Sequence, residues 1–370
     1  SGVVLAKNYL AKEFDIKTGD TLIDAFRKCR DIEVVSPHFD IYIEYSDMVR
    51  KIYNDFSDQV EPFGIDEAWI DVTGSTHLYG NGEEIANKIR ERIKNELDLT
   101  VSIGVSFNKV FAKLGSDMKK PDAVTIISKE NFRDKVFPLN ANELLCVGKS
   151  TNQRLLQYGI KTIGDIANCN CKFIERILGK NGITLWRFAN GYENSPVKVF
   201  GEYSDIKSVG NSTTTMRNLR NDEEVKIVFY TLAESVAKRL RDKRLKCKTI
   251  SISVRDEDLH TYEKQIQLNT PTYLACEIET IAMKMFKESY TWNKEIRSVG
   301  VRACNLCSEN SAVQTNLFDT NNSDRFQKIE TAMDKIRDRY GCNSIKRALL
   351  LQDNNFVAKD NNLVHPTSFY

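Results

Sequence analysis

The sequence predicts a multidomain α+β protein, and three observations lead to this prediction. The length of 370 residues exceeds that of most single domains. Strand-like and helix-like patterns alternate between residues 45 and 127, and again between residues 222 and 303. A segment rich in Asn and Gly separates these two parts, and its composition favours short helices joined by turns.

The first part should combine a helical segment with a sheet. Thr21 is a plausible N-cap, and Ile85, Ile89, Ile93 and Leu97 share one helical face. The expected elements are mostly helix over 1–37, helix over 45–56, strands on either side of a turn at 62–64, helix over 85–97, strand over 100–106, helix over 108–119 and strand over 123–127. This order predicts a split βαβ, ferredoxin-like sheet with helices on one face.

The remaining chain should form two further units and a tail. Residues 138–196 read as short helices, and residues 205–208 as a linker. The third unit is expected to contain helices over 222–241 and 272–286 and strands over 249–255, 263–268 and 297–303. The tail from residue 308 is polar and contains one expected helix, near 324–340.

Composition limits the environment of the protein. No apolar run reaches the ~18 residues that a membrane span needs, so we expect no membrane insertion. The nine cysteines are scattered and odd in number, which favours a reducing, cytoplasmic location over a disulfide framework. Cys304 and Cys307 have the spacing of half a zinc site, but no second such pair exists, so we interpret them as structural.

Two adjacent carboxylates, Asp66 and Glu67, follow the turn at residues 62–64. Neighbouring side chains of a straight strand point to opposite faces, so the pair can share an ion only where the chain bends. Such a pair favours Mg²⁺, the cofactor of phosphoryl and nucleotidyl transfer. Taken alone, an Asp-Glu pair is more often a pair of solvated surface acids.

Basic residues gather in two places. One expected helix is surrounded by four lysines, Lys109, Lys113, Lys119 and Lys120. Lys120 precedes Pro121, where a lysine can bind phosphate, although in isolation such a run is more often a solvated charged surface. Between Lys238 and Lys248 there are seven basic residues and one acid, which fits a polyanion partner or a solvated helix face.

Two other segments have patterns that indicate partners. Residues 144–166 contain Gly148-Lys149 and Gly159, which predicts a helical hairpin. Its backbone N–H groups can bind phosphate without reading sequence, and the alternative is an ordinary helical hairpin. In the polar tail, Gln314 is followed by Leu317 and Phe318, a pattern typical of peptides that anchor in an apolar pocket.

Together these residues resemble the Y-family DNA polymerases, the translesion enzymes of the DinB and UmuC type. The segment 64–71 is similar to the Ser-Ile-Asp-Glu palm motif of the family, and the run from Ser102 to Pro121 is the most specific match. Asn8-Tyr9-Leu10-Ala11-Lys12 is similar to a finger segment in which Arg stands at the position of Lys12. Residues 146–166 resemble the helix-hairpin-helix thumb, with Cys146 in place of the first hairpin Gly.

The resemblance implies a right-hand polymerase with a ferredoxin-like palm, small fingers, a helix-hairpin-helix thumb and an α+β little finger. The implied domains are fingers over 1–38, palm over 39–137, thumb over 138–200, little finger over 201–307 and a clamp-binding tail over 308–370. Asp66 and Glu67 are implied as catalytic metal ligands, with Mg²⁺ as cofactor. Further implied contacts are Val3, Tyr9, Lys12 and Lys120 for the nucleotide, Gly148, Lys149, Arg297 and Arg302 for DNA, and Gln314, Leu317 and Phe318 for the clamp.

The implied activity is template-directed addition of dNTPs to a primer 3′ end, by a monomer whose partners are primer-template DNA, dNTP and the sliding clamp. Family members begin with a strand that carries another metal-binding Asp and a steric gate. This sequence opens at Ser1-Gly2-Val3-Val4, so we expect it to lack the first palm strand and to be catalytically incomplete as it stands. Two alternatives remain, a non-catalytic DNA- or clamp-binding relative or fragment, and a nucleotidyl cyclase with a palm-like sheet.

Overall fold

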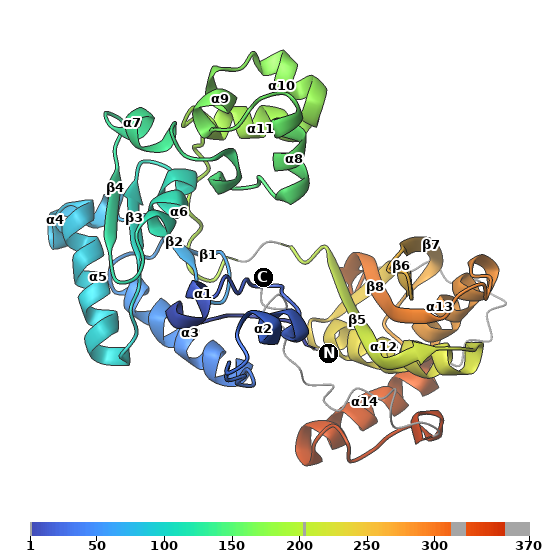
Figure 1. Ribbon diagram of the computed structural model, residues 1–370. Coiled ribbons are helices and arrows are strands. Elements are labelled where there is room, and N and C mark those ends of the chain that lie inside the picture. The colour runs from blue at the N-terminus through green and yellow to red at the C-terminus, as the bar shows by residue number, and fades with distance from the viewer. Residues whose placement is uncertain (1, 203–204, 312–322, 352–370) are drawn as a thin grey trace. The chain divides into compact units, whose positions relative to one another are not determined.

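A computed structural model describes residues 2–202, 205–311 and 323–351 (Figure 1). These residues divide into two compact units. The first unit contains residues 1–58 and 65–195, and the second contains residues 59–64 and 196–370. Each unit mixes helices and strands, which confirms the predicted α+β class, and each is described separately below.

The first unit begins with helices and continues as a βαβ arrangement. Its early elements are α1 (Tyr9–Glu13), α2 (Leu22–Lys28), α3 (Phe39–Asn54), β2 (Ala68–Ile70), α4 (Thr76–Tyr79) and α5 (Gly82–Leu97). Next come β3 (Ile103–Ser106), α6 (Lys109–Met118) and β4 (Val124–Ile127), and β3 pairs with β4 in parallel. Parallel neighbours need a crossover, and α6 supplies it.

Capping residues fix the helix starts that the sequence predicted. The Thr21 hydroxyl accepts a hydrogen bond from the backbone N–H of Asp24 at 3.1 Å, which confirms Thr21 as an N-cap. Asn81 and Glu84 form a capping box at the start of α5. The isoleucines at 85, 89 and 93 are buried against α3, as their spacing predicted. Helix α3 begins at Phe39, six residues before the predicted start at Tyr45.

Close approach of α6 to β3 requires glycine at position 104. A Cβ atom at Gly104 would lie 1.9 Å from the carbonyl oxygen of Ala112, which is backbone that cannot move aside. The first unit continues with α7 (Phe132–Val136), α8 (Lys149–Gln157), α9 (Ile163–Asn168), α10 (Cys171–Leu178) and α11 (Lys180–Ala189). Phe111 and Leu114 of α6 share one hydrophobic core with these helices, so α6 is fixed on both sides.

The second unit is built around a four-stranded antiparallel sheet in the order β5-β8-β6-β7 (Figure 1). Its elements are β1 (Val60–Pro62), β5 (Ser208–Leu219), α12 (Asp222–Asp242), β6 (Leu245–Asp256), β7 (Thr261–Thr272), α13 (Ala275–Ser289), β8 (Ile296–Ser308) and α14 (Ser323–Tyr340). One face of the sheet, with Ile250, Ile252 and Val301, is buried in the same core as α12 and α13. The sequence predicted β6, β7 and β8 but not the polar strand β5.

Candidate functional site

The N-terminus of α6 is held by its own N-cap residue and by a carboxylate from a distant segment. The Asn108 side chain accepts a hydrogen bond from the backbone N–H of Phe111 at 2.8 Å, so it caps the helix. The backbone N–H of Lys109 donates to Glu193 Oε2 at 3.2 Å. A carboxylate at a helix N-terminus is favourable because the helix dipole is positive there. These contacts fix the first turn of α6, which begins at Lys109.

Trp69 fixes the position of β2 against α6. Its indole Nε1 donates a hydrogen bond to the Lys109 carbonyl oxygen at 2.9 Å, and Lys109 Nζ lies 5.5 Å from the centre of the indole ring. Glu67 lies directly before β2, two residues before Trp69, and its carboxylate contacts Lys113 of α6. Glu67 is therefore presented to α6 one helical turn beyond Lys109.

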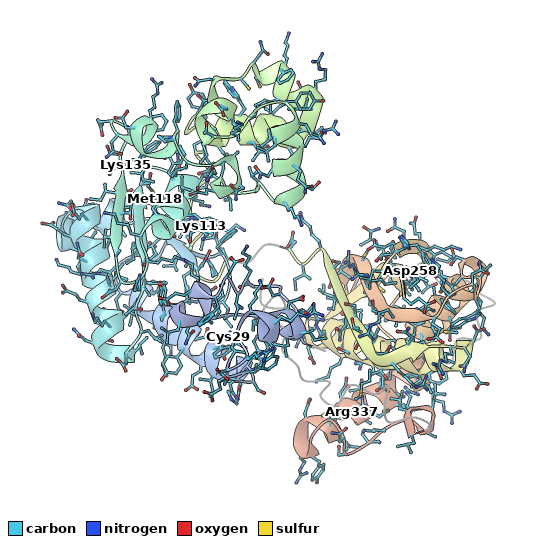
Figure 2. The ribbon with its side chains drawn as sticks, viewed as in Figure 1. Cys29, Lys113, Met118, Lys135, Asp258 and Arg337 are labelled. Carbon is cyan, nitrogen blue, oxygen red and sulfur yellow. The ribbon has the colours of Figure 1, made fainter. Side chains whose placement is uncertain are left out.

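A row of alternating charges follows from this placement. Lys113 Nζ lies 3.0 Å from Glu67 Oε1 and 2.6 Å from Asp117 Oδ2. The other carboxylate oxygen of Asp117 lies 2.9 Å from Lys120 Nζ. Figure 2 labels Lys113 on the ribbon of α6. Glu67 and Lys120, both predicted as site residues, thus belong to one connected row, whereas the role of Lys113 and Asp117 as the link was not predicted.

The environment of the row stabilises its charged forms. Burial lowers the pKa of Lys113, but the hydrogen bonds to Asp117 and Glu67 outweigh burial, and the pKa is raised overall. For Asp117, burial raises the pKa, but hydrogen bonds from Lys113 and Lys120 lower it overall. Both groups therefore stay ionised at neutral pH. The Lys113 side chain is 20% exposed and that of Lys120 is 51% exposed, so Lys120 is the more open of the two lysines.

The segment before Glu67 rests on one face of α3. The Ser46 hydroxyl donates a hydrogen bond to the Ile65 carbonyl oxygen. Burial raises the pKa of Tyr53 to about 12, and the charge of nearby Asp66 adds to this effect while Arg50 opposes it. Ser46 and Tyr53 lie two helical turns apart, so α3 supports the bend that contains Asp66. Asp66 itself is exposed.

The two carboxylates suit a hard cation. Mg²⁺ takes oxygen ligands and is commonly held by one or two carboxylates together with substrate phosphates. Within the described part of the chain, no three His, Cys, Asp or Glu side chains form a group that could hold an ion. Asp66 and Glu67 offer two such carboxylates, of which Asp66 is exposed and Glu67 contacts Lys113 at 3.0 Å.

The predicted nucleotide-binding residues near the N-terminus are exposed. Val3 forms an isolated bridge with Thr21 and is 65% exposed. Tyr9 begins α1 and is 56% exposed, and Lys12 lies in the last turn of the same helix. Within the described ranges, no hydrogen bond or ion pair joins these side chains to the row of Glu67, Lys113, Asp117 and Lys120.

The predicted hairpin places the N-terminus of a helix at Gly148 and Lys149. Gly148 is the N-cap of α8, and Lys149 is its first residue. Cys146 has a φ of 70°, in the left-handed region that favours glycine. The resemblance expected a glycine at this position, and the backbone explains why.

The two arginines of β8 differ in their surroundings. Arg302 is exposed and pairs in register with Gly210 of β5 and Ser251 of β6, on the sheet face opposite the helices. A Cβ at Gly210 would lie 3.0 Å from Arg302 Cγ, so the stem of the arginine crosses the glycine. Arg297 is half-buried and donates a hydrogen bond to the Thr215 carbonyl oxygen.

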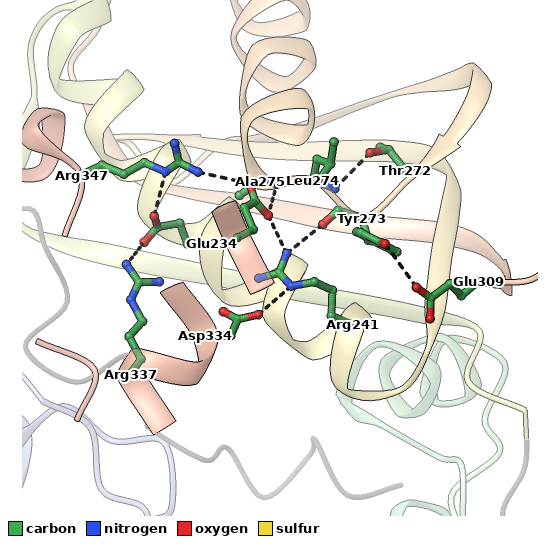
Figure 3. A network of polar contacts seen from close by, with 11 residues as sticks. Glu234, Arg241, Thr272, Tyr273, Leu274, Ala275, Glu309, Asp334, Arg337 and Arg347 are labelled. Carbon is green, nitrogen blue, oxygen red and sulfur yellow. Dashed lines mark hydrogen bonds and ion pairs between the residues drawn. The ribbon is translucent and has the colours of Figure 1, made fainter. Parts of the chain in front are cut away.

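The basic cluster from Lys238 to Lys248 requires a correction. Arg241 lies 2.6 Å from Glu330 and 2.7 Å from Asp334, both on α14, and its side chain is 13% exposed (Figure 3). Lys238 lies 2.9 Å from Asp338 of the same helix. Arg241 therefore binds the protein itself, and its expected role toward a polyanion is wrong. The acids that neutralise it lie about 90 residues away in sequence, so local charge counting missed them.

The proposed clamp-binding residues Gln314, Leu317 and Phe318 lie outside the described residues. All nine cysteines are free thiols, and Cys304 and Cys307 lie in β8. Within the described ranges, no helix combines the length and apolar character that crossing a bilayer requires.

Comparison with known proteins identifies the class. Residues 1–117 match the impB/mucB/samB family, and residues 206–317 match the C-terminal domain of that family. The DNA polymerase IV of Acetivibrio thermocellus is 47% identical over 353 residues, which cover 95% of this chain and 88% of the relative. The DNA polymerase IV of Clostridium acetobutylicum is 37% identical, with 95% and 87% covered.

Solved structures agree with the sequence comparison. A Y-family DNA polymerase chimera of Dbh and Dpo4 superposes with a TM-score of 0.71 at 26% identity, covering 83% of this chain and 88% of the chimera. DinB from Sulfolobus solfataricus gives a TM-score of 0.52 at 26% identity, covering 82% and 88%. The chain belongs to the impB/mucB/samB family, the DinB-like Y-family DNA polymerases.

Proposed function

We propose that this protein is a translesion DNA polymerase, which adds dNTPs to a primer 3′ end as a template directs. The row of Glu67, Lys113, Asp117 and Lys120 carries the proposal, because it joins the carboxylate that we propose to bind metal to the lysine that we propose to bind phosphate. The identity of 47% to a DNA polymerase IV supports the same activity. The alternatives of a non-catalytic relative and of a cyclase gain no support from these relatives.

Each residue of the proposed site has a role that its environment allows. Asp66 and Glu67 would hold Mg²⁺, which lowers the pKa of a primer hydroxyl and stabilises charge at the attacked phosphorus. Lys120 would bind the triphosphate as a point charge, since its ammonium group is half-exposed. Tyr9 and Lys12 would add contacts from α1, and Val3 would lie over the new base pair. Lys12 cannot bind phosphate through the planar fork of an arginine.

The remaining residues are proposed to bind the DNA backbone without reading the base sequence. Gly148 and Lys149 present the N-terminus of α8 to a phosphate, and Arg302 stands exposed on the open sheet face. Arg297 would contribute from the start of β8. Gln314, Leu317 and Phe318 would bind the sliding clamp. The domain limits given above, a cytoplasmic location and a monomeric state are proposed along with these roles.

Primer extension by the full-length protein tests the proposal. Wild-type protein should extend a primer on an undamaged template and past a lesion when Mg²⁺ is supplied. Asp66→Asn and Glu67→Gln should each reduce incorporation at least ~100-fold, because each removes a charge that the site needs. Binding of a fluorescent primer-template should change little in both variants. Normal extension by either variant would reject its assignment, and no extension by wild type would favour the non-catalytic alternative.

A further inference from the structure

Glu67, Lys113, Asp117 and Lys120 form the row of alternating charges described above. Two of its members, Lys113 and Asp117 of α6, are not expected to contact the substrate. Lys109, Lys113 and Asp117 recur at every fourth residue, so they share one face of α6. Trp69 fixes this face against β2 through its hydrogen bond of 2.9 Å to the Lys109 carbonyl oxygen. The side chain of Glu67 therefore meets Lys113, and the next turn carries Asp117 toward Lys120.

We infer that Lys113 and Asp117 are positioning residues, which hold Glu67 and Lys120 in one charge-compensated row. This inference rests on the proposed polymerase function and extends it to two residues outside the expected metal and nucleotide contacts. The Lys113 ammonium group contacts both carboxylates, at 3.0 Å and 2.6 Å. Without that cation, Glu67 and Asp117 would be two uncompensated acids close to one another.

Asp117 connects the two ends of the row because it uses both of its oxygens. One oxygen contacts Lys113 and the other contacts Lys120, at 2.9 Å. A triphosphate that binds Lys120 competes with Asp117 for the same ammonium group. Asp117 keeps its partner in Lys113, so the exchange leaves no bare carboxylate. Nucleotide binding at one end of the row is thereby coupled to the cation that orients Glu67 at the other end.

The two residues should affect different kinetic constants. Lys113→Met should lower the maximal rate of dCTP incorporation opposite a template G by more than tenfold. It should change the apparent dCTP affinity by less than threefold, because Lys120 is retained. Asp117→Asn should tighten apparent dCTP affinity several-fold, since Lys120 is released from its carboxylate partner, and should lower the rate several-fold. The double variant should match Lys113→Met in rate, because both residues act through Glu67.

A binding measurement separates positioning from damage to the fold. Mn²⁺ binding to the DNA complex without nucleotide, measured by electron paramagnetic resonance, should be retained or tighter in Lys113→Met, because a neighbouring cation has been removed. Lys119→Gln changes the same charge on an exposed neighbour and should match wild type in rate and Mn²⁺ binding.

Three outcomes would overturn the inference while wild-type protein extends primers. These outcomes are a wild-type rate for Lys113→Met, loss of Mn²⁺ binding in that variant, and multiplicative rate losses in the double variant. If Lys113→Met proves unfolded by circular dichroism, unchanged dCTP affinity in Asp117→Asn would overturn the inference by itself. An inactive wild-type protein would instead reject the proposed function.

Discussion

At the scale of single residues, the backbone conformation of Cys146 destabilises the hairpin of residues 144–166. Its φ of 70° places a residue with a Cβ atom in the left-handed region, which costs roughly 1–2 kcal/mol. Glycine adopts this conformation without that cost, although it loses more backbone entropy on folding. Cys146→Gly should therefore raise the free energy of unfolding by about 1 kcal/mol, measured by urea denaturation.

Cys169 offers a matched control for this substitution. It has an ordinary φ of −67° at the end of α9, so Cys169→Gly should lower the free energy of unfolding. If Cys146→Gly also lowers it, the left-handed conformation of Cys146 contributes no strain and the prediction fails. Both variants lose a thiol, but Cys169→Gly also loses packing against the core, so only the opposite sign of the two effects tests the role of φ.

At the scale of elements, the cap of α9 makes the hairpin sensitive to acid. Backbone N–H groups of Lys161 and Thr162 donate to Asp165 Oδ2 at 2.9 and 2.8 Å and lower the pKa of that carboxyl. A lowered pKa means that the stabilisation is complete above the unfolded value of ~4 and is lost as pH falls through the folded value.

Asp165→Asn should therefore reduce stability at pH 7 and flatten its decline below pH ~4, since the variant has no proton to gain there. Thermal unfolding measured from pH 7 to pH 3 would follow both effects. Glu175→Gln removes an exposed carboxylate from α10 and serves as the control. Equal acid sensitivity in Asp165→Asn and wild type would contradict the prediction.

The contact between α12 and α14 depends on a buried ion network (Figure 3). Glu330 is 3% exposed, contacts Arg241 at 2.6 Å and accepts a hydrogen bond from the Ala275 backbone N–H at 3.0 Å. Glu234 joins the network through Arg337 at 3.0 Å and Arg347 at 3.3 Å. Removing one partner from such a network leaves a buried charge without compensation.

Arg241→Met should lower the free energy of unfolding by about 3 kcal/mol, because Asp334 loses its cation while Glu330 keeps Arg347 at 3.3 Å. Limited proteolysis should then cut α14 faster. Lys238→Met removes a partly exposed pair with Asp338 and should cost about 1 kcal/mol or less. Equal losses in the two variants would mean that burial does not determine the strength of these contacts.

At the scale of the whole molecule, the sequence predicted elements with a strong hydrophobic period and missed those without one. β6 alternates buried Ile250, Ile252 and Val254 with polar residues, so its position was clear. β5 contains mostly Ser, Thr and Asn, and its strand form depends on pairing with β8. Tertiary pairing of this kind leaves little trace in the local sequence.

The same limit applies to the site. Glu67 and Lys120 could be predicted because their motifs resemble those of a known family. Their connection through Lys113 could not, because it requires β2 to lie against α6, and Trp69 fixes that contact over 40 positions of sequence. Arg241 was misread for a related reason, since its acidic partners lie in α14, about 90 residues further along the sequence.

Binding of DNA should reflect the difference between the two arginines of β8. Arg302 is exposed beside the small residues Gly210 and Ser251, so its guanidinium group is open to a phosphate. Arg302→Ala should weaken binding uniformly across DNA sequences and make the slope of log affinity against log salt shallower by about one unit. Arg297 already donates to the Thr215 carbonyl oxygen, so Arg297→Ala should reduce the slope by less. Fluorescence anisotropy over a series of salt concentrations, with two primer-templates of unrelated sequence, measures both quantities. If Arg302 contacts a phosphate, binding of the Arg302→Ala variant releases fewer counterions from any DNA sequence, and the slope must become shallower. A changed sequence preference with an unchanged slope would instead mean that Arg302 reads bases.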